Sequence, residues 1–314
     1  LNYTNKKVVV IGSGATAITL VPSLAKEVSH VTMLQRSPTY IVSRPADDRF
    51  IQTLYDGLPR AVADRMTRWV KNYGHQWTYK ALRRGPKLAK ALLVRLAQKE
   101  LGPDFDIEKD FTPDYAPWDQ RICVAPDGDF FKALKSGAAS VVTDSIARFT
   151  PRGIELESGD VLDADIVVTA TGLNLVILGE VDFSVDGAPI DFSETWSYKG
   201  VAFSGVPNLF SCFGYVNASW TLRAELVSAF VGRVVNHLHE TQSVRVVPTL
   251  RPSDRDMIPR RGVEGFSPGY IARSAHLFPK QGDRKPWINP QDYKRDERLL
   301  LKDSIDDGVL AFSP

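Results

Sequence analysis

The chain has 314 residues, with 39 Lys and Arg against 37 Asp and Glu, and a formal net charge of +2. This length suffices for one large or two modest domains, and apolar and charged fractions of 43% and 24% are those of a folded globular protein rather than a disordered one. The charge balance predicts no nucleic-acid partner. Two distant cysteines exclude a disulfide framework and a Cys-x-x-Cys metal site. No apolar run approaches the ~18 residues of a membrane span. A cytoplasmic location is expected.

The segment 8–17, VVVIGSGATA, runs from a short apolar strand through Gly-x-Gly-x-x-Ala into a helix. Gly12 permits the tight turn, Gly14 lets the backbone approach a phosphate, and Ala17 allows close packing of helix and strand. The first helical N–H groups then face an anion. The candidate pyrophosphate-binding residues are Gly12, Ser13, Gly14, Ala15, Thr16 and Ala17. The alternative is an ordinary glycine-containing junction of an α/β protein.

The segment 30–35, HVTMLQ, predicts a second buried strand, and Arg36 and Ser37 follow it. The residue that contacts the ribose is expected about 20 residues after the glycine fingerprint. A carboxylate there would select NAD, whereas a guanidinium and a hydroxyl suit a 2′-phosphate. We therefore expect Arg36 and Ser37 to favour NADP, and the alternative is a solvated arginine at a strand end.

A helix is expected over 15–27, although Pro22 lies inside it and should kink or reset it. Residues 46–118 then show helical spacing, as in Leu88, Leu92 and Leu96. Residues 60–100 carry 11 Lys or Arg and 2 Asp or Glu, a net charge of +9. A solvated helical face, whose apolar residues pack inward, is the favoured interpretation, and weak peripheral contact with an anionic membrane is the alternative.

Strand patterns return after residue 119. We expect a strand at 121–126, a helix at 129–134, strands and a hairpin over 140–160, and a buried parallel strand within 163–172. Farther on, residues 208–215 look strand-like, and a helix is expected over 219–240 with Ser219 as its N-cap.

Six motifs together resemble the flavin-dependent class B monooxygenases of the Baeyer-Villiger type, most closely the group that includes the mycobacterial ethionamide-activating monooxygenase. The motifs are VVVIGSGATA, MLQRSPTYIVSRP, PWDQRICVAPDGDFF, DIVVTATG, PNLFSCFGYVNASWTLRAELVS and GFSPGYIARS. The resemblance implies an α/β fold. Residues 1–45 and 119–172 would form a Rossmann-like NADP-binding domain, 46–118 a helical insertion, and 173–314 the C-terminal part of the FAD-binding domain of a two-dinucleotide-binding-domain flavoprotein.

The resemblance also implies a reaction and a set of site residues. NADPH would reduce FAD, and O2 would then form a C4a-peroxyflavin that oxidises a ketone or a sulfur-containing substrate. Arg121 corresponds to the catalytic arginine, whose permanent charge suits a developing oxyanion. Gln120 stands where relatives often have a lysine, which predicts a weaker 2′-phosphate contact. From the residues alone, Arg121 could equally form a salt bridge with Asp119.

The same resemblance places Thr171 and Gly172 at the crossing between the NADP and FAD domains, and Phe213, Gly214 and Asn217 beside the flavin. A plain turn after a strand, and a structural loop before a helix, are the alternatives. His237 and His239 point to different faces of a helix, so we expect no metal site. Ser13 is not in a Gly-x-Ser-x-Gly elbow, so a hydrolase is not expected.

A second glycine fingerprint and the N-terminal FAD-binding half of the family have no counterpart in this sequence. We therefore expect an N-terminally truncated chain with an incomplete FAD domain, exposed apolar surface and unpaired strand edges. The alternative function is an NADP-binding module without oxygenase activity of its own.

Overall fold

The computed structural model describes residues 1–260 and 268–314, so residues 265–267 of the last motif lie outside the described part. The chain divides into two compact units, Leu1–Leu173 and Asn174–Pro314. Throughout the described residues, every helix is too short or too polar to span a bilayer.

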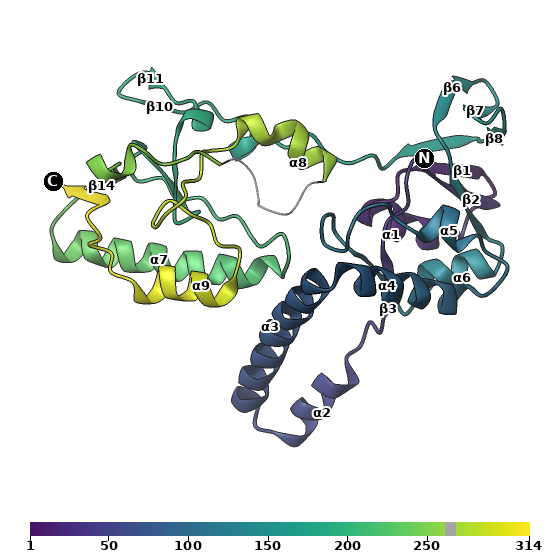
Figure 1. The fold of residues 1–314 in the computed structure, drawn as a ribbon, viewed down its shortest axis with the longest axis horizontal. Helices are drawn as coiled ribbons and strands as arrows, with labels where there is room; N and C mark the ends of the chain where they lie inside the picture. The colour runs from purple at the N-terminus through teal and green to yellow at the C-terminus, as the bar shows by residue number, and fades with distance from the viewer. Residues whose placement is uncertain (261–267) are drawn as a thin grey trace. The chain divides into compact units, whose positions relative to one another are not determined.

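A four-stranded sheet with the order β5-β2-β1-β9 forms the centre of the first unit, and all its strands are parallel (Figure 1). The prediction of an α/β fold is therefore confirmed. The strands are β1 (Lys7–Ile11), β2 (His30–Gln35), β5 (Ala139–Thr143) and β9 (Ile166–Thr169).

Strand β1 is buried on both of its faces. Val8 and Val10 point into a core that α1 (Ala15–Leu24) and α6 (Asp129–Lys135) cover. Val9 and Ile11 point into a second core, which the antiparallel sheet of β6 (Ile146–Thr150), β7 (Gly153–Leu156) and β8 (Val161–Asp163) covers. Burial on both faces explains why this strand is a continuous apolar run rather than an alternating one.

Two of the predicted elements differ from the structure. Helix α1 ends at Leu24 instead of residue 27, and Pro22 lies buried in its last turn, two residues before the helix ends. Strand β9 was predicted to be a fully buried strand, but it pairs only with β1 at the edge of the sheet, and Val167 is 37% exposed.

The segment between the parallel strands β3 (Ile41–Arg44) and β4 (Cys123–Pro126) contains four helices, α2 (Arg49–Gly57), α3 (Arg60–Arg84), α4 (Pro86–Leu101) and α5 (Ile107–Phe111). Ala97 and Leu101 of α4 pack into the first core. Helix α2 lies beside α3 (Figure 1), and Ala63 and Asn72 are the only buried residues along α3.

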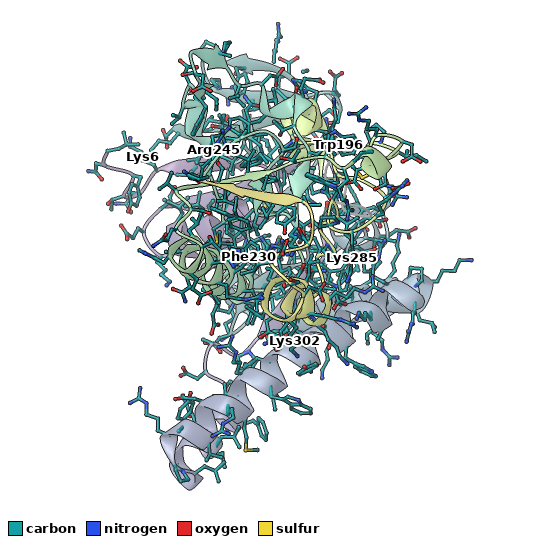
Figure 2. All side chains as sticks on the ribbon, turned by 90° about the vertical axis from the view of Figure 1, so that its left-hand side faces the viewer. Lys6, Trp196, Phe230, Arg245, Lys285 and Lys302 are labelled. Carbon is teal, nitrogen blue, oxygen red and sulfur yellow. The ribbon has the colours of Figure 1, made fainter. Side chains whose placement is uncertain are left out.

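The second unit is organised around α7 (Trp220–Glu240), as predicted. Phe230, near the middle of α7, is completely buried in this unit's core (Figure 2). Smaller elements surround the helix: β10 (Ser184–Val185), β11 (Ala188–Pro189), β12 (Ser197–Tyr198), β13 (Ala202–Phe203), β14 (Arg245–Pro248), β15 (Leu310–Ser313), α8 (Gly269–Ser274), α9 (Tyr293–Glu297) and a π-helical turn, Arg298–Lys302.

Two local predictions for this unit were wrong. The stretch 208–215 forms one isolated bridge, between Phe210 and Ala202, instead of a strand. Ser219 is at the N-cap position of α7, but its hydroxyl pairs with the Thr221 hydroxyl and does not cap a backbone N–H.

Candidate nucleotide-binding site

The glycine loop between β1 and α1 is held against the end of β9. Gly12 has φ +124°, and a Cβ atom there would lie 2.3 Å from the carbonyl oxygen of Ala170. The Gly12 N–H donates to the Leu34 carbonyl at 2.8 Å, and the Ala170 N–H donates to the Ile11 carbonyl at 2.8 Å. Only glycine fits here, because both the backbone angle and the space exclude a side chain.

Gly14 presents a different environment. It is the N-cap of α1, and a Cβ atom built on it would have no atom within 4 Å. The first helical turn has no acidic residue, Ala15 and Thr16 are exposed, and Ala17 is fully buried against the sheet. The open backbone and the positive end of a ten-residue helix form a cradle suited to a phosphate group.

The loop after β2 is tied to the glycine loop. The Ser13 hydroxyl donates to the Ser37 carbonyl at 3.0 Å, which brings the exposed residues Arg36 and Ser37 beside the cradle. Two hydrogen bonds hold the end of β2 in place. The Gln35 amide donates to the Asp110 carbonyl and to the Thr143 hydroxyl, both at 2.8 Å. The structure thus brings together the predicted residues 12–17, Arg36 and Ser37.

Thr171 and Gly172 follow the end of β9, against which the glycine loop is held. Both are exposed, and they are the first and second residues after Ala170, whose carbonyl lies against Gly12. Gly172 has φ +97°, a left-handed conformation that favours glycine at the end of the first unit.

Arg121 is exposed just before β4, at the end of a loop whose residues 115–120 are partly or fully buried, and helix α3 contacts that loop. Arg83 forms an ion pair with the half-buried Asp119, whose second oxygen accepts from the Ala116 N–H at 3.1 Å. Asp119 is therefore paired with Arg83, and across the described residues no ion pair joins it to Arg121, contrary to the alternative from the sequence. The backbone of Gln120, the neighbour of Arg121, forms an isolated β-bridge with Pro117.

Trp118, within the same loop, adopts φ +72° and packs under α3. Its ring meets those of His75 and Tyr79 edge-on, with centroids 5.9 and 5.3 Å away. Sequence reasoning missed these α3 residues, because the contacts join positions that are far apart in the chain and belong to no motif.

A buried group of side chains lies behind the Arg121 loop. The Tyr40 hydroxyl donates to the Tyr115 carbonyl at 2.7 Å, and the Thr39 and Tyr115 hydroxyls lie 3.0 Å apart. Burial raises the pKa of Tyr40 to about 12 and that of the neighbouring Cys123 thiol to about 11, so both groups stay protonated near neutral pH.

Phe213, Gly214 and Asn217 belong to the second unit and precede α7. Gly214 packs so tightly that a Cβ atom would lie 2.3 Å from the Trp220 ring, whose centroid is 4.9 Å from that of Phe213. The Asn217 amide donates to the Gln291 carbonyl at 3.2 Å. These contacts give the loop a defined shape, and its role beside a flavin stays a prediction.

The sequence did not reveal a buried polar cluster beneath that loop. Arg223 of α7 and Asp296 of α9 are completely buried and lie 2.7 Å apart, and the guanidinium also donates to the Lys199 carbonyl at 2.9 Å and stacks 5.7 Å from the Tyr215 ring centre. Arg223 falls within an ordinary helical pattern, which gives no sign that its charge is buried.

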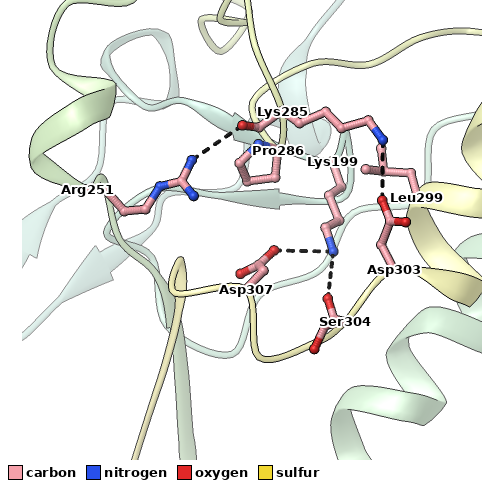
Figure 3. A pocket seen from close by; sticks show the side chains of 8 residues that line it. All are labelled: Lys199, Arg251, Lys285, Pro286, Leu299, Asp303, Ser304 and Asp307. Carbon is pink, nitrogen blue, oxygen red and sulfur yellow. Dashed lines mark hydrogen bonds and ion pairs between the residues drawn. The ribbon is translucent and has the colours of Figure 1, made fainter.

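A small cavity of about 160 Å³ in the second unit contains none of the predicted site residues (Figure 3). Its charged lining residues are largely paired with one another. Lys199 lies 3.3 Å from Asp307, and Lys285 lies 3.4 Å from Asp303. Burial lowers the pKa of Lys199 although Asp307 opposes this shift.

The chain is similar to known proteins along its whole length. It is 46% identical over 314 residues to the FAD-containing monooxygenase EthA of Mycobacterium tuberculosis, covering 100% of this chain and 64% of that protein. It is 46% identical over 315 residues to the probable FAD-binding monooxygenase AlmA of Acinetobacter baylyi, covering 99% of this chain and 62% of that protein. The chain thus spans less than two thirds of the length of these relatives. A search of family models found no match.

Two solved structures share the fold. An oxidised steroid monooxygenase bound to NADP matches 100% of this chain and 68% of its own, with a TM-score of 0.71 and 17% identity. The OTEMO complex with FAD and NADP matches 82% of this chain and 56% of its own, with a TM-score of 0.64 and 17% identity.

Proposed function

Because the chain is homologous along its whole length to the FAD-containing monooxygenases, we propose that it forms the NADPH-binding part, and part of the flavin-binding region, of an FAD-dependent monooxygenase. The observation that carries this proposal is the cradle at Gly14 with Arg36 and Ser37 tied beside it through Ser13. An open backbone at a helix N-terminus suits the pyrophosphate, and a guanidinium next to a hydroxyl suits the 2′-phosphate.

The residues after β2 fit NADPH better than NADH. No carboxylate follows β2 at the position where NAD-dependent proteins hold the ribose, since Arg36 and Ser37 occupy it. Both residues are exposed, so a 2′-phosphate reaches them without any rearrangement of the core. We assign Gln120, Thr171 and Gly172 to the same nucleotide, with Gln120 contributing no charge.

In this proposal FAD, when bound, supplies the activation of O2. Arg121 provides a guanidinium that stays charged at working pH, so it holds an anion next to it and cannot give up a proton to it. The ion pair between Arg83 and Asp119 fixes the loop that carries Arg121. Phe213, Gly214 and Asn217 are assigned to the flavin, and the substrate class is a ketone, as in Baeyer-Villiger oxidation, or a sulfur compound.

Nucleotide titrations test the proposed specificity. The 314-residue chain is expected to bind NADPH more tightly than NADH. Arg36→Ala should weaken NADPH binding about 10- to 100-fold, because it removes charge-assisted hydrogen bonds of about 1.5–3 kcal/mol, and should change NADH binding little. Lys135→Ala, which removes an exposed charge elsewhere in the same unit, serves as the control. Equal losses for both nucleotides would contradict the assignment of Arg36.

The visible absorption spectrum tests the flavin part. A flavin band that stays with the protein after unbound FAD is removed, and that bleaches on adding NADPH, supports oxygenase chemistry in this polypeptide. NADPH binding without a flavin band favours the second candidate, an NADP-binding module without oxygenase activity.

A further inference from the structure

Helix α3 carries a continuous stripe of large apolar side chains on its outer surface. Val62, Met66, Trp69, Tyr73 and Trp77 follow one another at steps of four, three, four and four residues, which places them on one face of a helix. Their side chains are 38%, 41%, 63%, 37% and 74% exposed. Figure 2 shows side chains projecting outward along this long helix.

The neighbouring helices α2 and α4 also expose large apolar side chains. Leu88, Leu92 and Leu96 occupy the outer face of α4 and are 80%, 52% and 43% exposed, whereas its inner face packs into the core. Helix α2 adds Phe50 and Tyr55, and the Tyr55 hydroxyl donates to Asp64 of α3 at 2.6 Å. We call this surface the insertion face; it comprises Phe50, Tyr55, Val62, Met66, Trp69, Tyr73, Trp77, Leu88, Leu92 and Leu96.

The exposed apolar residues of the first unit are concentrated there. Ten of the sixteen large apolar side chains exposed in Leu1–Leu173 lie on the insertion face, and the others are scattered singly. A single exposed apolar residue is ordinary, but a group of this size on one insertion marks a surface that binds something. Tryptophan at 74% exposure in the middle of a helix is especially costly in water.

The charges around the stripe of α3 and the leucines of α4 are mostly basic. Arg65 and Arg84 lie near the stripe of α3, and Arg95 and Lys99 near the leucines of α4; all four are exposed. Of the two acidic residues in 60–100, Asp64 accepts the Tyr55 hydrogen bond and Glu100 is only partly exposed. The α2 end of the face also carries the exposed residues Asp47, Asp48 and Asp56, and Asp48 is paired with Lys71. The excess of basic residues over 60–100 favours a partner that is anionic as well as apolar.

We propose that the insertion face docks on the surface of an anionic lipid bilayer. Trp, Tyr and Leu side chains would enter the boundary between headgroups and acyl chains, and Lys and Arg would contact the phosphates, which is the arrangement of helices that lie in a membrane interface. A second copy of the chain fits less well, because a twofold contact through this face would bring together two copies of the segment 60–100, each with a net charge of +9. The proposal goes beyond the proposed oxidation chemistry and does not depend on it.

Vesicle sedimentation tests the proposal with the 314-residue chain. It should bind vesicles that contain phosphatidylglycerol and should not bind vesicles of phosphatidylcholine alone. Binding should weaken at least about tenfold when salt rises from about 0.1 M to about 0.5 M, since salt screens the basic residues. Tryptophan emission should shift to the blue on binding and be quenched by brominated acyl chains.

Matched variants locate the contact. Trp69→Ser with Trp77→Ser, and separately Lys87→Glu with Lys99→Glu, should each weaken binding at least about tenfold. Phe149→Ser, 61% exposed on β6, and Lys132→Glu with Lys135→Glu on α6 are the controls and should leave binding unchanged. All these residues are exposed, so circular dichroism and the unfolding midpoint should match those of the unchanged chain.

Three results would overturn the proposal. The first is no binding to anionic vesicles at low salt. The second is an equal loss of binding in the control variants. The third is self-association in the ultracentrifuge that the tryptophan replacements abolish while vesicle binding persists, because the insertion face would then contact a second copy.

Discussion

At the scale of single residues, the two glycines of the fingerprint have separate roles. Gly12 is needed by the fold, because its φ of +124° and its contact with the Ala170 carbonyl leave no room for a side chain. Gly14 has φ −78° and open space in front of it, so the folded chain tolerates a methyl group there. The methyl group would instead occupy the space proposed for the phosphates.

We therefore predict opposite outcomes for the two alanine variants. Gly12→Ala should lower the free energy of unfolding by about 3 kcal/mol, through backbone strain and the clash with Ala170. Gly14→Ala should change stability by less than about 1 kcal/mol but weaken NADPH binding. Urea unfolding and nucleotide titration measure the two effects. A stable Gly12→Ala chain would contradict the account of the loop.

The two cysteines should differ in reactivity with a thiol reagent. Burial raises the pKa of Cys123 to about 11, whereas Cys212 is exposed. Only the thiolate reacts, so at pH 8 the native chain should label at one cysteine quickly and at the other only after unfolding. Cys212→Ser identifies the fast site, and fast labelling that survives it would contradict this prediction.

At the scale of elements, α3 connects the insertion to the loop that carries Arg121. The Arg83–Asp119 ion pair is half-buried, with side chains 33% and 35% exposed, and the rings of His75 and Tyr79 hold Trp118. A helix with few buried residues thus still positions a loop proposed to be catalytic.

Arg83→Ala should therefore loosen residues 116–122. Hydrogen exchange of this peptide should quicken severalfold, while global stability falls by only about 1 kcal/mol, because the pair is partly solvated. Arg84→Ala, at the next and more exposed position, is the control. Asp119→Asn should loosen the same peptide, and the double variant should add little, since both changes remove one interaction. Additive effects would argue against a single interaction between Arg83 and Asp119 that orders this loop.

At the scale of a whole unit, the buried pair of Arg223 and Asp296 affects the stability of Asn174–Pro314. Asp296→Asn should destabilise this unit by about 3–5 kcal/mol, because it leaves the guanidinium buried without a counter-charge. Replacing both residues, Arg223→Met with Asp296→Leu, should cost less than the single change. Unfolding followed by circular dichroism and exchange of α7 peptides tests this. A double variant less stable than Asp296→Asn would contradict the prediction.

Much of the fold was predictable from local pattern. The apolar runs 8–11 and 30–35 became parallel neighbours, and the spacing of Leu226, Phe230 and Val234 identified α7. These patterns are informative because a strand buried on two faces and a helix buried on one each impose a period on consecutive residues. Burial of β9 was less predictable, because an apolar run does not show whether the strand lies at the centre or the edge of a sheet.

The sequence by itself determined the glycine loop, the Arg-Ser pair after β2 and the basic, helical character of 60–100, because each depends on residues that are close together in the chain. Only the tertiary structure decided that the Ala170 carbonyl packs against Gly12, that Asp119 pairs with Arg83 rather than Arg121, and that Arg223 forms an ion pair with Asp296. It also decided that the aromatic residues of α3 face outward. Such contacts join distant positions, and the spacing of side chains along one helix cannot tell which of its faces another element covers.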